Sequence, residues 1–287
     1  MVVRYRLPAG SEPPLTDVIG HLLDTGPTLR VRTKRGDVVE IAEADVIAIK
    51  ELSAAPVRTA DIRNLEHAAA LAWPGVEQFW LDGWLLRFGH GSTRRANSAV
   101  PLNVSATFGI RQVVDWYSSR GLPPLIAAPD RLLRVPPDVP FDAETVVMTR
   151  DLQTGIANSA VTIVDRPDDE WLRLYQRDVP VEVLTAVVDG EVAFATTGRA
   201  AVGRGAVTAA PDGTRWAGLA AVHVVSDARR RGLARELCDA LLGWGAERGA
   251  TRAYVQVLGD NVAARSLYES MGFVVQHMSR YVDARSL

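Results

Sequence analysis

The chain has 287 residues, of which 47% are hydrophobic and 23% are charged, and its formal net charge at pH 7 is −2. This length predicts two units, and the nearly balanced charge excludes an overall electrostatic attraction to nucleic acid or to a membrane surface. The one cysteine, Cys238, rules out a disulfide framework and a cysteine-ligated metal site, so we expect a cytoplasmic protein without a metal. Residues 1–8 lack the apolar core of a signal peptide, and no apolar run approaches the roughly 18 residues of a membrane span.

Residues 1–56 contain short β-like segments separated by glycine and proline, at 18–23, 29–33, 37–41 and 46–50. Residues 34–36 predict a hairpin turn between the second and third of these. The unit resembles a small SH3-like β-barrel. Four basic residues could form an edge for nucleic acid or an acidic partner, but alternating charge on a strand more often marks its solvated face, which we expect here. These residues are Arg30, Arg32, Lys34 and Arg35.

After residue 57 the pattern changes to a helix and then an apolar hairpin. Helical periodicity covers 59–72, and the hairpin covers 79–88, with its turn at Asp82 and Gly83. Three aromatic residues alternate along this hairpin within an apolar run, which predicts core positions rather than a cofactor site. They are Trp80, Trp84 and Phe88.

A second helix is expected at 110–120, and a proline-rich stretch at 135–140 is typical of a connector. Residues 113–122 faintly echo 266–273. Residues 57–134 are therefore either a degenerate copy of the C-terminal half of the chain or similar to it by chance.

The stretch 216–273 has the pattern of a single binding site for a phosphorylated cofactor. An apolar run at 217–225 is long enough for one strand, and the loop 226–232 then opens a helix whose apolar residues recur at helical spacing. A second strand at 253–258 and a short helix at 262–271 follow.

The loop before the first of these helices has the composition of a phosphate site. The first N–H groups of a helix lack intrahelical partners and carry a partial positive charge. Gly232 has no Cβ, so a pyrophosphate can approach the backbone closely, and three arginines add positive charge at the mouth. They are Arg229, Arg230 and Arg231. A solvated basic turn is the alternative interpretation.

Two motifs, in this order, resemble the acetyl-CoA-binding core of the GNAT superfamily of acyl-CoA N-acyltransferases. Residues 229–234 match its R-x-x-G-x-A pyrophosphate loop, and residues 261–273 match its N-x-x-A-x-x-L-Y-x-x-x-G-F signature. The resemblance implies a GNAT fold of the α/β (α+β) class with a mixed central sheet over 57–287, with 141–287 as the acetyl-CoA-binding half. With a small barrel ahead of it, the chain also resembles an actinobacterial group of GNAT proteins, some of which are regarded as amino-acid N-acetyltransferases.

The resemblance implies roles for particular residues. Backbone amides of the loop and the first helical turn would hold the pyrophosphate, and the preceding strand would pair with the pantetheine arm. Asn261 would hydrogen-bond a pantetheine amide, and Tyr268 would protonate the departing thiolate. For Tyr268 the alternative is a packed ring with a solvated hydroxyl. The expected cofactor-binding residues are Val222, His223, Val224, Arg229, Arg230, Arg231, Gly232, Leu233, Ala234, Arg235, Asn261 and Tyr268.

The chain departs from the resemblance at the general base. Several members carry a glutamate where this chain has Gln256, and an amide cannot accept a proton. A lysine amine, with a pKa of ~10.4, costs about 4 to 5 kcal/mol to present neutral at pH 7, whereas the α-amine of a peptide, at ~7.7, costs about 1. The missing carboxylate therefore favours an α-amine or another weakly basic acceptor. His223 is the nearest substitute catalytic base; a structural role for it, or Glu191 with a water chain, are the alternatives.

We expect an N-acetyltransferase that uses acetyl-CoA to acetylate the α-amine of an amino acid, with glutamate as one possibility, or of a peptide. The competing hypothesis is an acetyl-CoA sensor that has lost the chemistry and uses its barrel as an interaction module. The sequence leaves the oligomeric state undecided, with a homodimer as one option, and a membrane partner is not expected. An acidic acceptor would need arginines in the cleft. The candidates are Arg94 and Arg95, in the polar loop 92–98, together with Arg199 and Arg204. For the loop 92–98, the alternative that we favour is a structured loop without a binding role.

Overall fold

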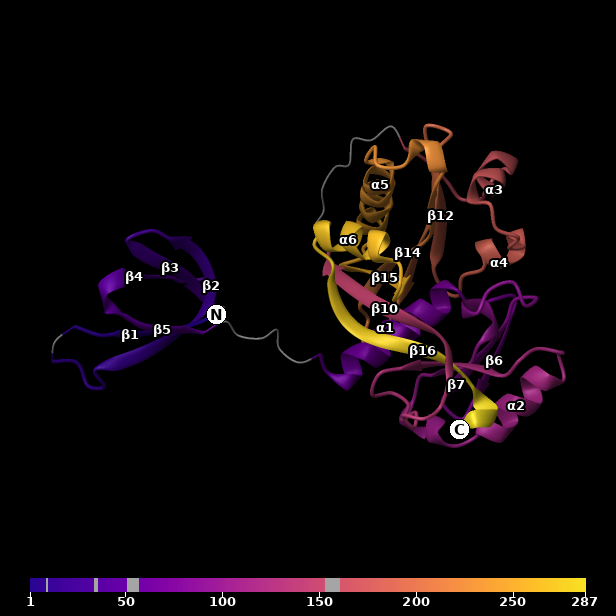
Figure 1. The fold of residues 1–287 in the computed structure, drawn as a ribbon, viewed down its shortest axis with the longest axis horizontal. Coiled ribbons are helices and arrows are strands. Elements are labelled where there is room, and N and C mark those ends of the chain that lie inside the picture. The colour runs from indigo at the N-terminus through magenta and orange to yellow at the C-terminus, as the bar shows by residue number, and fades with distance from the viewer. Residues whose placement is uncertain (9, 34–35, 51–56, 153–160) are drawn as a thin grey trace. The chain divides into compact units, whose positions relative to one another are not determined.

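The computed structural model describes residues 1–8, 10–33, 36–50, 57–152 and 161–287, which fall into two units, Met1–Pro56 and Val57–Leu287 (Figure 1). The first unit is a five-stranded antiparallel sheet in the order β4-β3-β2-β1-β5. Its strands are β1 (Val2–Arg6), β2 (Leu15–Thr25), β3 (Thr28–Thr33), β4 (Val38–Ala42) and β5 (Val46–Lys50).

The small core of the first unit follows the alternation of its strands. In β3, Leu29 and Val31 point into the core, whereas Arg30 and Arg32 are exposed. Arg30 forms an ion pair with Glu40 on the neighbouring strand at 3.2 Å. The expected turn at 34–36 and the basic residues Lys34 and Arg35 lie largely outside the described residues, and β1 was not expected from the sequence.

The second unit is built on an eight-stranded mixed sheet in the order β11-β12-β13-β14-β15-β10-β16-β9, in which only the β14 and β15 pairing is parallel among the described strands. The eight strands are β9 (Leu125–Pro129), β10 (Phe141–Asp151), β11 (Thr162–Val164), β12 (Glu191–Thr197), β13 (Ala201–Ala209), β14 (Arg215–Val224), β15 (Arg252–Leu258) and β16 (Val274–Asp283). A separate three-stranded sheet contains β6 (Glu77–Leu81), β7 (Trp84–Phe88) and β8 (Val100–Pro101).

Six α-helices accompany these sheets among the described residues. They are α1 (Thr59–Ala72), α2 (Ile110–Ser118), α3 (Asp169–Tyr175), α4 (Val181–Thr185), α5 (Leu233–Glu247) and α6 (Val262–Ser270). None of them is long and apolar enough to cross a membrane.

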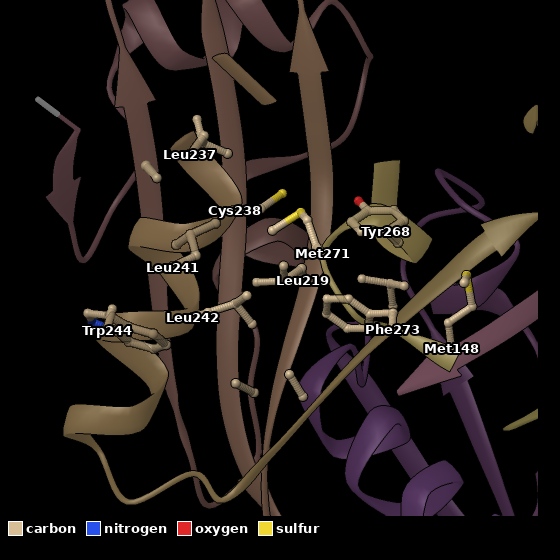
Figure 2. Close-up of a cluster of buried hydrophobic side chains, with 14 of the residues drawn as sticks. Met148, Leu219, Leu237, Cys238, Leu241, Leu242, Trp244, Tyr268, Met271 and Phe273 are labelled. Carbon is tan, nitrogen blue, oxygen red and sulfur yellow. The ribbon is translucent and has the colours of Figure 1, made fainter. Parts of the chain in front are cut away.

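Alternation along the central strands places two cores on opposite faces of the large sheet. On one face, α5 contributes Leu237, Leu241 and Trp244 to a cluster that reaches Tyr268 and Phe273 (Figure 2). On the other face, α1 contributes a second set of apolar side chains. Leu65, Ala68 and Ala69 pack there against Val147, Trp216 and Tyr254.

The hairpin at 79–88 forms as expected, and its turn residues Asp82 and Gly83 have φ angles of 42° and 89°. The predicted core positions are only partly right. Trp84 is fully buried, but Trp80 is 52% exposed, because every residue of β6 except the last is exposed at the edge of the small sheet. The Trp80 ring lies 5.7 Å from the His67 ring of α1.

Candidate active site

The two parallel strands β14 and β15 separate part of the way along the sheet. They pair from Trp216 with Arg252 to Leu219 with Val255 and no further. A cavity of about 280 Å³ opens where the pairing stops. Its walls are residues 219–223 of β14, residues 255–258 of β15, Asn261, Ala264 and Tyr268 from the α6 side, and Trp73, Thr93, Arg94, Arg95, Thr145, Tyr175, Arg177 and Tyr281.

A bulge in β14 shapes this opening. The pairing of β13 with β14 shifts by an extra residue between Val202 and Arg204, and Ala221 has a φ of 54°. The amide of Val225 donates to Ala200 on the β13 side at 2.9 Å. Since backbone groups alternate along a strand, the peptide groups two strand positions apart, at Val222 and Val224, face the open side. The Val224 carbonyl accepts from Arg229, so the peptide groups of Val222 and the amide of Val224 are left to pair with an extended ligand, whereas the peptide groups of His223 face β13.

The loop before α5 has the geometry of an anion site. Arg230 and Gly232 have φ angles of 63° and 85°, and Gly232 is the N-cap of α5. Apart from its two chain neighbours, no described residue has an atom within 4 Å of where a Cβ on Gly232 would be, so the space beside the backbone is open. Arg229, Arg230 and Arg231 are all exposed. Open space, unpaired first-turn N–H groups and positive charge together fit a pyrophosphate.

Two arginines at this end have partners within the protein. The Arg229 Nε donates to the Val224 carbonyl at 3.1 Å, which ties the loop to the end of β14. The Arg235 guanidinium donates to the Ser270 Oγ at 2.6 Å, which links α5 to α6. The side chains of Arg230 and Arg231 have no ion pair among the described residues.

The two motif residues expected to contact the cofactor lie on α6. Asn261 is the N-cap, and its Oδ1 accepts a hydrogen bond from the Ala264 amide at 3.1 Å, so its NH₂ group is left for a ligand. Tyr268 lines the cavity but is only 6% exposed, and its hydroxyl hydrogen-bonds the Cys238 thiol. Burial, as the largest cause, raises the pKa of Tyr268 far above its ordinary value, so the hydroxyl keeps its proton.

His223 also lines the cavity, and its Nε2 is buried without a hydrogen-bond partner among the described residues. Burial and, after it, the charges of Arg229 and Arg177 lower the pKa of His223, so the imidazole is neutral at pH 7. Glu191 lies elsewhere: it forms an ion pair with Arg248 at 2.9 Å and lines a different cavity beside α5.

A buried carboxylate that the sequence analysis missed adjoins Gln256. The Gln256 Nε2 donates to the Glu66 Oε1 at 3.4 Å, and the His277 Nε2 lies 2.8 Å from the same oxygen. Glu66 and His277 are each 4% exposed. The available signal was the position of Glu66 on the apolar face of its helix, beside Ile62 and Leu65 at helical spacing.

The four arginines proposed for an acidic acceptor have different environments. Arg94 and Arg95 line the cavity, and Arg94 forms an ion pair with Asp142. Arg199 does not line the cavity and pairs with Glu170 at 2.6 Å. Arg204 is 1% exposed and donates to the carbonyls of Leu184, Ala72 and Ala186, so its role is structural. Burial lowers the pKa of Arg204 to about 9.

Arg177 joins Arg95 in the cavity wall, although the sequence analysis did not single it out. Neither arginine has an ion pair among the described residues, and the Arg95 Nε is buried without a hydrogen-bond partner there. The described wall of the cavity therefore contains three arginines and no carboxylate.

The chain matches two family descriptions along its length. Residues 59–282 match "Probable histone acetyltransferase Rv0428c C-terminal", and residues 1–50 match "Rv0428c N-terminal Sm-like domain". The five-stranded antiparallel sheet of this unit is consistent with the small SH3-like barrel expected from the sequence, and this match describes the unit as Sm-like.

Individual relatives agree with the family matches. The chain is 54% identical over 289 residues to the Mycobacterium tuberculosis protein named "Probable histone acetyltransferase Rv0428c", a similarity that covers 100% of this chain and 95% of that protein. It is 27% identical over 245 residues to the "Uncharacterized N-acetyltransferase YobR" of Bacillus subtilis, covering 74% and 94%. A GCN5-related N-acetyltransferase from Kribbella flavida shares the fold, with a TM-score of 0.54, 12% identity, and coverage of 77% of this chain and 94% of that one.

The similar fold and the named relatives confirm the GNAT fold and the acetyltransferase activity that the two motifs predicted. The two family descriptions together cover both the N-terminal sheet and the acetyltransferase unit of this chain. This protein belongs to the Rv0428c family of GNAT-type N-acetyltransferases.

Proposed function

We propose that the acceptor of this acetyltransferase is a primary amine that carries a carboxylate nearby, such as an α-amino acid. The observation that carries the proposal is the acceptor end of the cavity, where three arginines and no carboxylate line the described wall. Arg95 and Arg177 have no ion pair among the described residues, so both can bind an anionic group. A carboxylate of the acceptor is the group that this charge favours.

The other lining residues, together with the loop before α5, support acetyl-CoA as the acetyl donor. The residues of that loop would hold its pyrophosphate, and the peptide groups of Val222 and the amide of Val224 would pair with its pantetheine arm. Acetyl-CoA supplies a thioester that an amine can attack. Tyr268 keeps its proton and lies in the cavity wall, so its hydroxyl would donate that proton to the departing thiolate.

The experiment is acetyl-CoA-dependent thiol release against separate acceptor pools: free amino acids, their α-amides, peptides with free N-termini, lysine peptides and polyamines. We expect release with amino acids, and a loss of at least about tenfold in kcat/KM when the carboxylate is converted to an amide, since one charge-assisted contact is removed. Equal rates for acids and amides would contradict the role of the arginines. Bound acetyl-CoA without release from any pool would favour the sensor hypothesis.

A second acceptor class is the lysine side chain of a basic protein, which is favoured by the name of the M. tuberculosis relative. The cavity opposes it, because a lysine-rich segment would approach three arginines and no acidic side chain in the described wall. Release with lysine peptides alone would establish this class and overturn the carboxylate proposal, while leaving the transfer reaction intact.

A further inference from the structure

The residue that stands at the expected position of the catalytic base has a buried carboxylate behind it. Gln256 on β15 and His277 on β16 are both paired with Val147 of the intervening β10, so they flank it in one row across the sheet. Glu66 reaches this row from α1, and one of its oxygens contacts both side chains, at 3.4 Å and 2.8 Å. The carboxylate that position 256 lacks is thus supplied from a helix.

A small cavity beside this carboxylate shares lining residues with the main cavity. Its volume is about 10 Å³, the lower limit of what one water molecule needs. Glu66 lines it, together with Arg95, Thr145, Gln256 and Tyr281, and these last four also line the main cavity. A carboxylate, an amide and two hydroxyl groups offer enough polar partners to hold one water between Glu66 and an acceptor amine.

Among the described residues, the ion-pair partner of Glu66 is His277, and no arginine pairs with it. Arg87 of β7 lines the same small cavity, but its guanidinium donates to Ser98 and to the Trp73 carbonyl. The other polar or titratable groups that line the cavity or interact with Glu66 are His277, Gln256, Arg95, Thr145, Ser279, Tyr254 and Tyr281. A carboxylate that is not bound to a guanidinium keeps an oxygen that can take up a proton.

We propose that Glu66 accepts the proton that the acceptor amine loses, through one water in the small cavity, with His277 sharing that proton. In the balanced step, the amine nitrogen forms a bond to the acetyl carbon and the carbon–sulfur bond breaks. Before it bonds, the nitrogen of the ammonium form gives one proton through the water to Glu66. After it bonds, it loses a second proton, which replaces the one that Tyr268 gives to the sulfur. This role rests on the proposed transfer reaction, but it does not depend on which amine is the acceptor.

The test is Glu66→Gln in the full chain, measured as thiol release over a pH series together with acetyl-CoA affinity by calorimetry. At pH 7 we expect kcat/KM to fall about 100-fold, while the Kd for acetyl-CoA changes by less than about twofold. The ratio of the wild-type kcat/KM to that of the variant should shrink as the pH approaches the pKa of the acceptor amine, because the amine then arrives already deprotonated. A merely structural role would lower melting temperature or affinity and leave that ratio constant across pH.

Two further variants separate charge from packing. The exchange variant E66Q/Q256E moves the carboxylate across the 3.4 Å hydrogen bond, and we expect it to regain at least about tenfold of the lost rate. Asp61→Asn removes the same charge from the first turn of the same helix, and wild-type kinetics are expected. If E66Q does not fold, the exchange variant decides: folded and active supports the role, and folded and inactive contradicts it.

The outcomes distinguish the two proposals. An active wild type whose E66Q variant matches it at every pH overturns the role of Glu66 and leaves the proposed function standing. A wild type that transfers acetyl to no amine in any pool contradicts both.

Discussion

Tyr268 is held where it can serve as a proton donor, at the boundary between the α5 core and the cleft. Its ring packs 5.6 Å from Phe273, and its hydroxyl meets Cys238, as the grouping of these side chains in Figure 2 illustrates. Burial raises the pKa of the Cys238 thiol to about 12, so both partners remain protonated at any physiological pH. The Tyr268 hydroxyl is therefore always in the form that can donate to the departing thiolate.

At this scale we predict that Tyr268→Phe lowers kcat by about 10- to 1,000-fold, because the thiolate loses its proton source, while acetyl-CoA affinity stays within about twofold. Thiol release and calorimetry measure the two quantities. The matched control is Cys238→Ala, which removes the partner of the hydroxyl and keeps the hydroxyl itself. A similar loss of kcat in both variants would show that packing, not proton donation, is affected.

At the scale of elements, the link between β14 and α5 carries both ends of the proposed cofactor site. The bulge at Ala221 turns free backbone groups into the cleft, and the left-handed residues Arg230 and Gly232 lead the chain into the helix. Gly232 and Gly213 make a matched pair for testing this link. Their φ angles are 85° and 83°, and apart from chain neighbours no described residue has an atom within 4 Å of the position of a Cβ on either.

We predict that Gly232→Ala and Gly213→Ala each destabilise the fold by about 1 kcal/mol, because alanine resists a positive φ. Only Gly232→Ala should also weaken acetyl-CoA binding, by about tenfold or more, because its methyl group would stand in the path of the pyrophosphate. Thermal melts and calorimetry on the two variants provide the comparison. Equal affinities would show that the loop does not hold the phosphates.

At the scale of the whole molecule, two half-buried histidines couple stability to pH. Burial lowers the pKa of His67 on α1, and burial followed by two arginines lowers that of His223 on β14. Each is harder to protonate in the folded chain than in the unfolded chain, so protonation favours unfolding. Their contribution to stability is complete above about pH 6.5 and is lost as the pH falls through the folded pKa values.

We therefore predict that the melting temperature falls by a few degrees between about pH 7 and pH 5. His67→Gln should make this decline shallower, since one of the two coupled groups is removed. Calorimetric melts across the series test it. The lowered pKa values of Asp142 and Asp283 act in the same direction only at lower pH, so they do not obscure this window. A melting temperature that rises on acidification would contradict the coupling of stability to these two histidines.

Local sequence patterns correctly predicted the elements whose own residues determine their structure. Helix α1 has the bounds that its periodicity and the following Trp73-Pro74-Gly75 predict, and the turn at Asp82 and Gly83 is correct. The central strand β10 was missed, although five consecutive residues of it are buried. It pairs with β15 and β16, both more than a hundred positions later, and no local pattern reveals such partners.

The sequence alone determined the family, the acetyl-CoA motifs and the residue types at the phosphate loop, because each of these depends on short-range spacing. Only the tertiary structure decided which side chains share the cleft. It placed Arg204 and Arg199 outside the cleft and Arg177 within it, since burial and ion pairing depend on packing. It also brought Glu66 to Gln256 and His277, which are 190 and 211 positions away in the sequence. The reason is that α1 packs on the face of the sheet where the side chains of Gln256 on β15 and His277 on β16 lie.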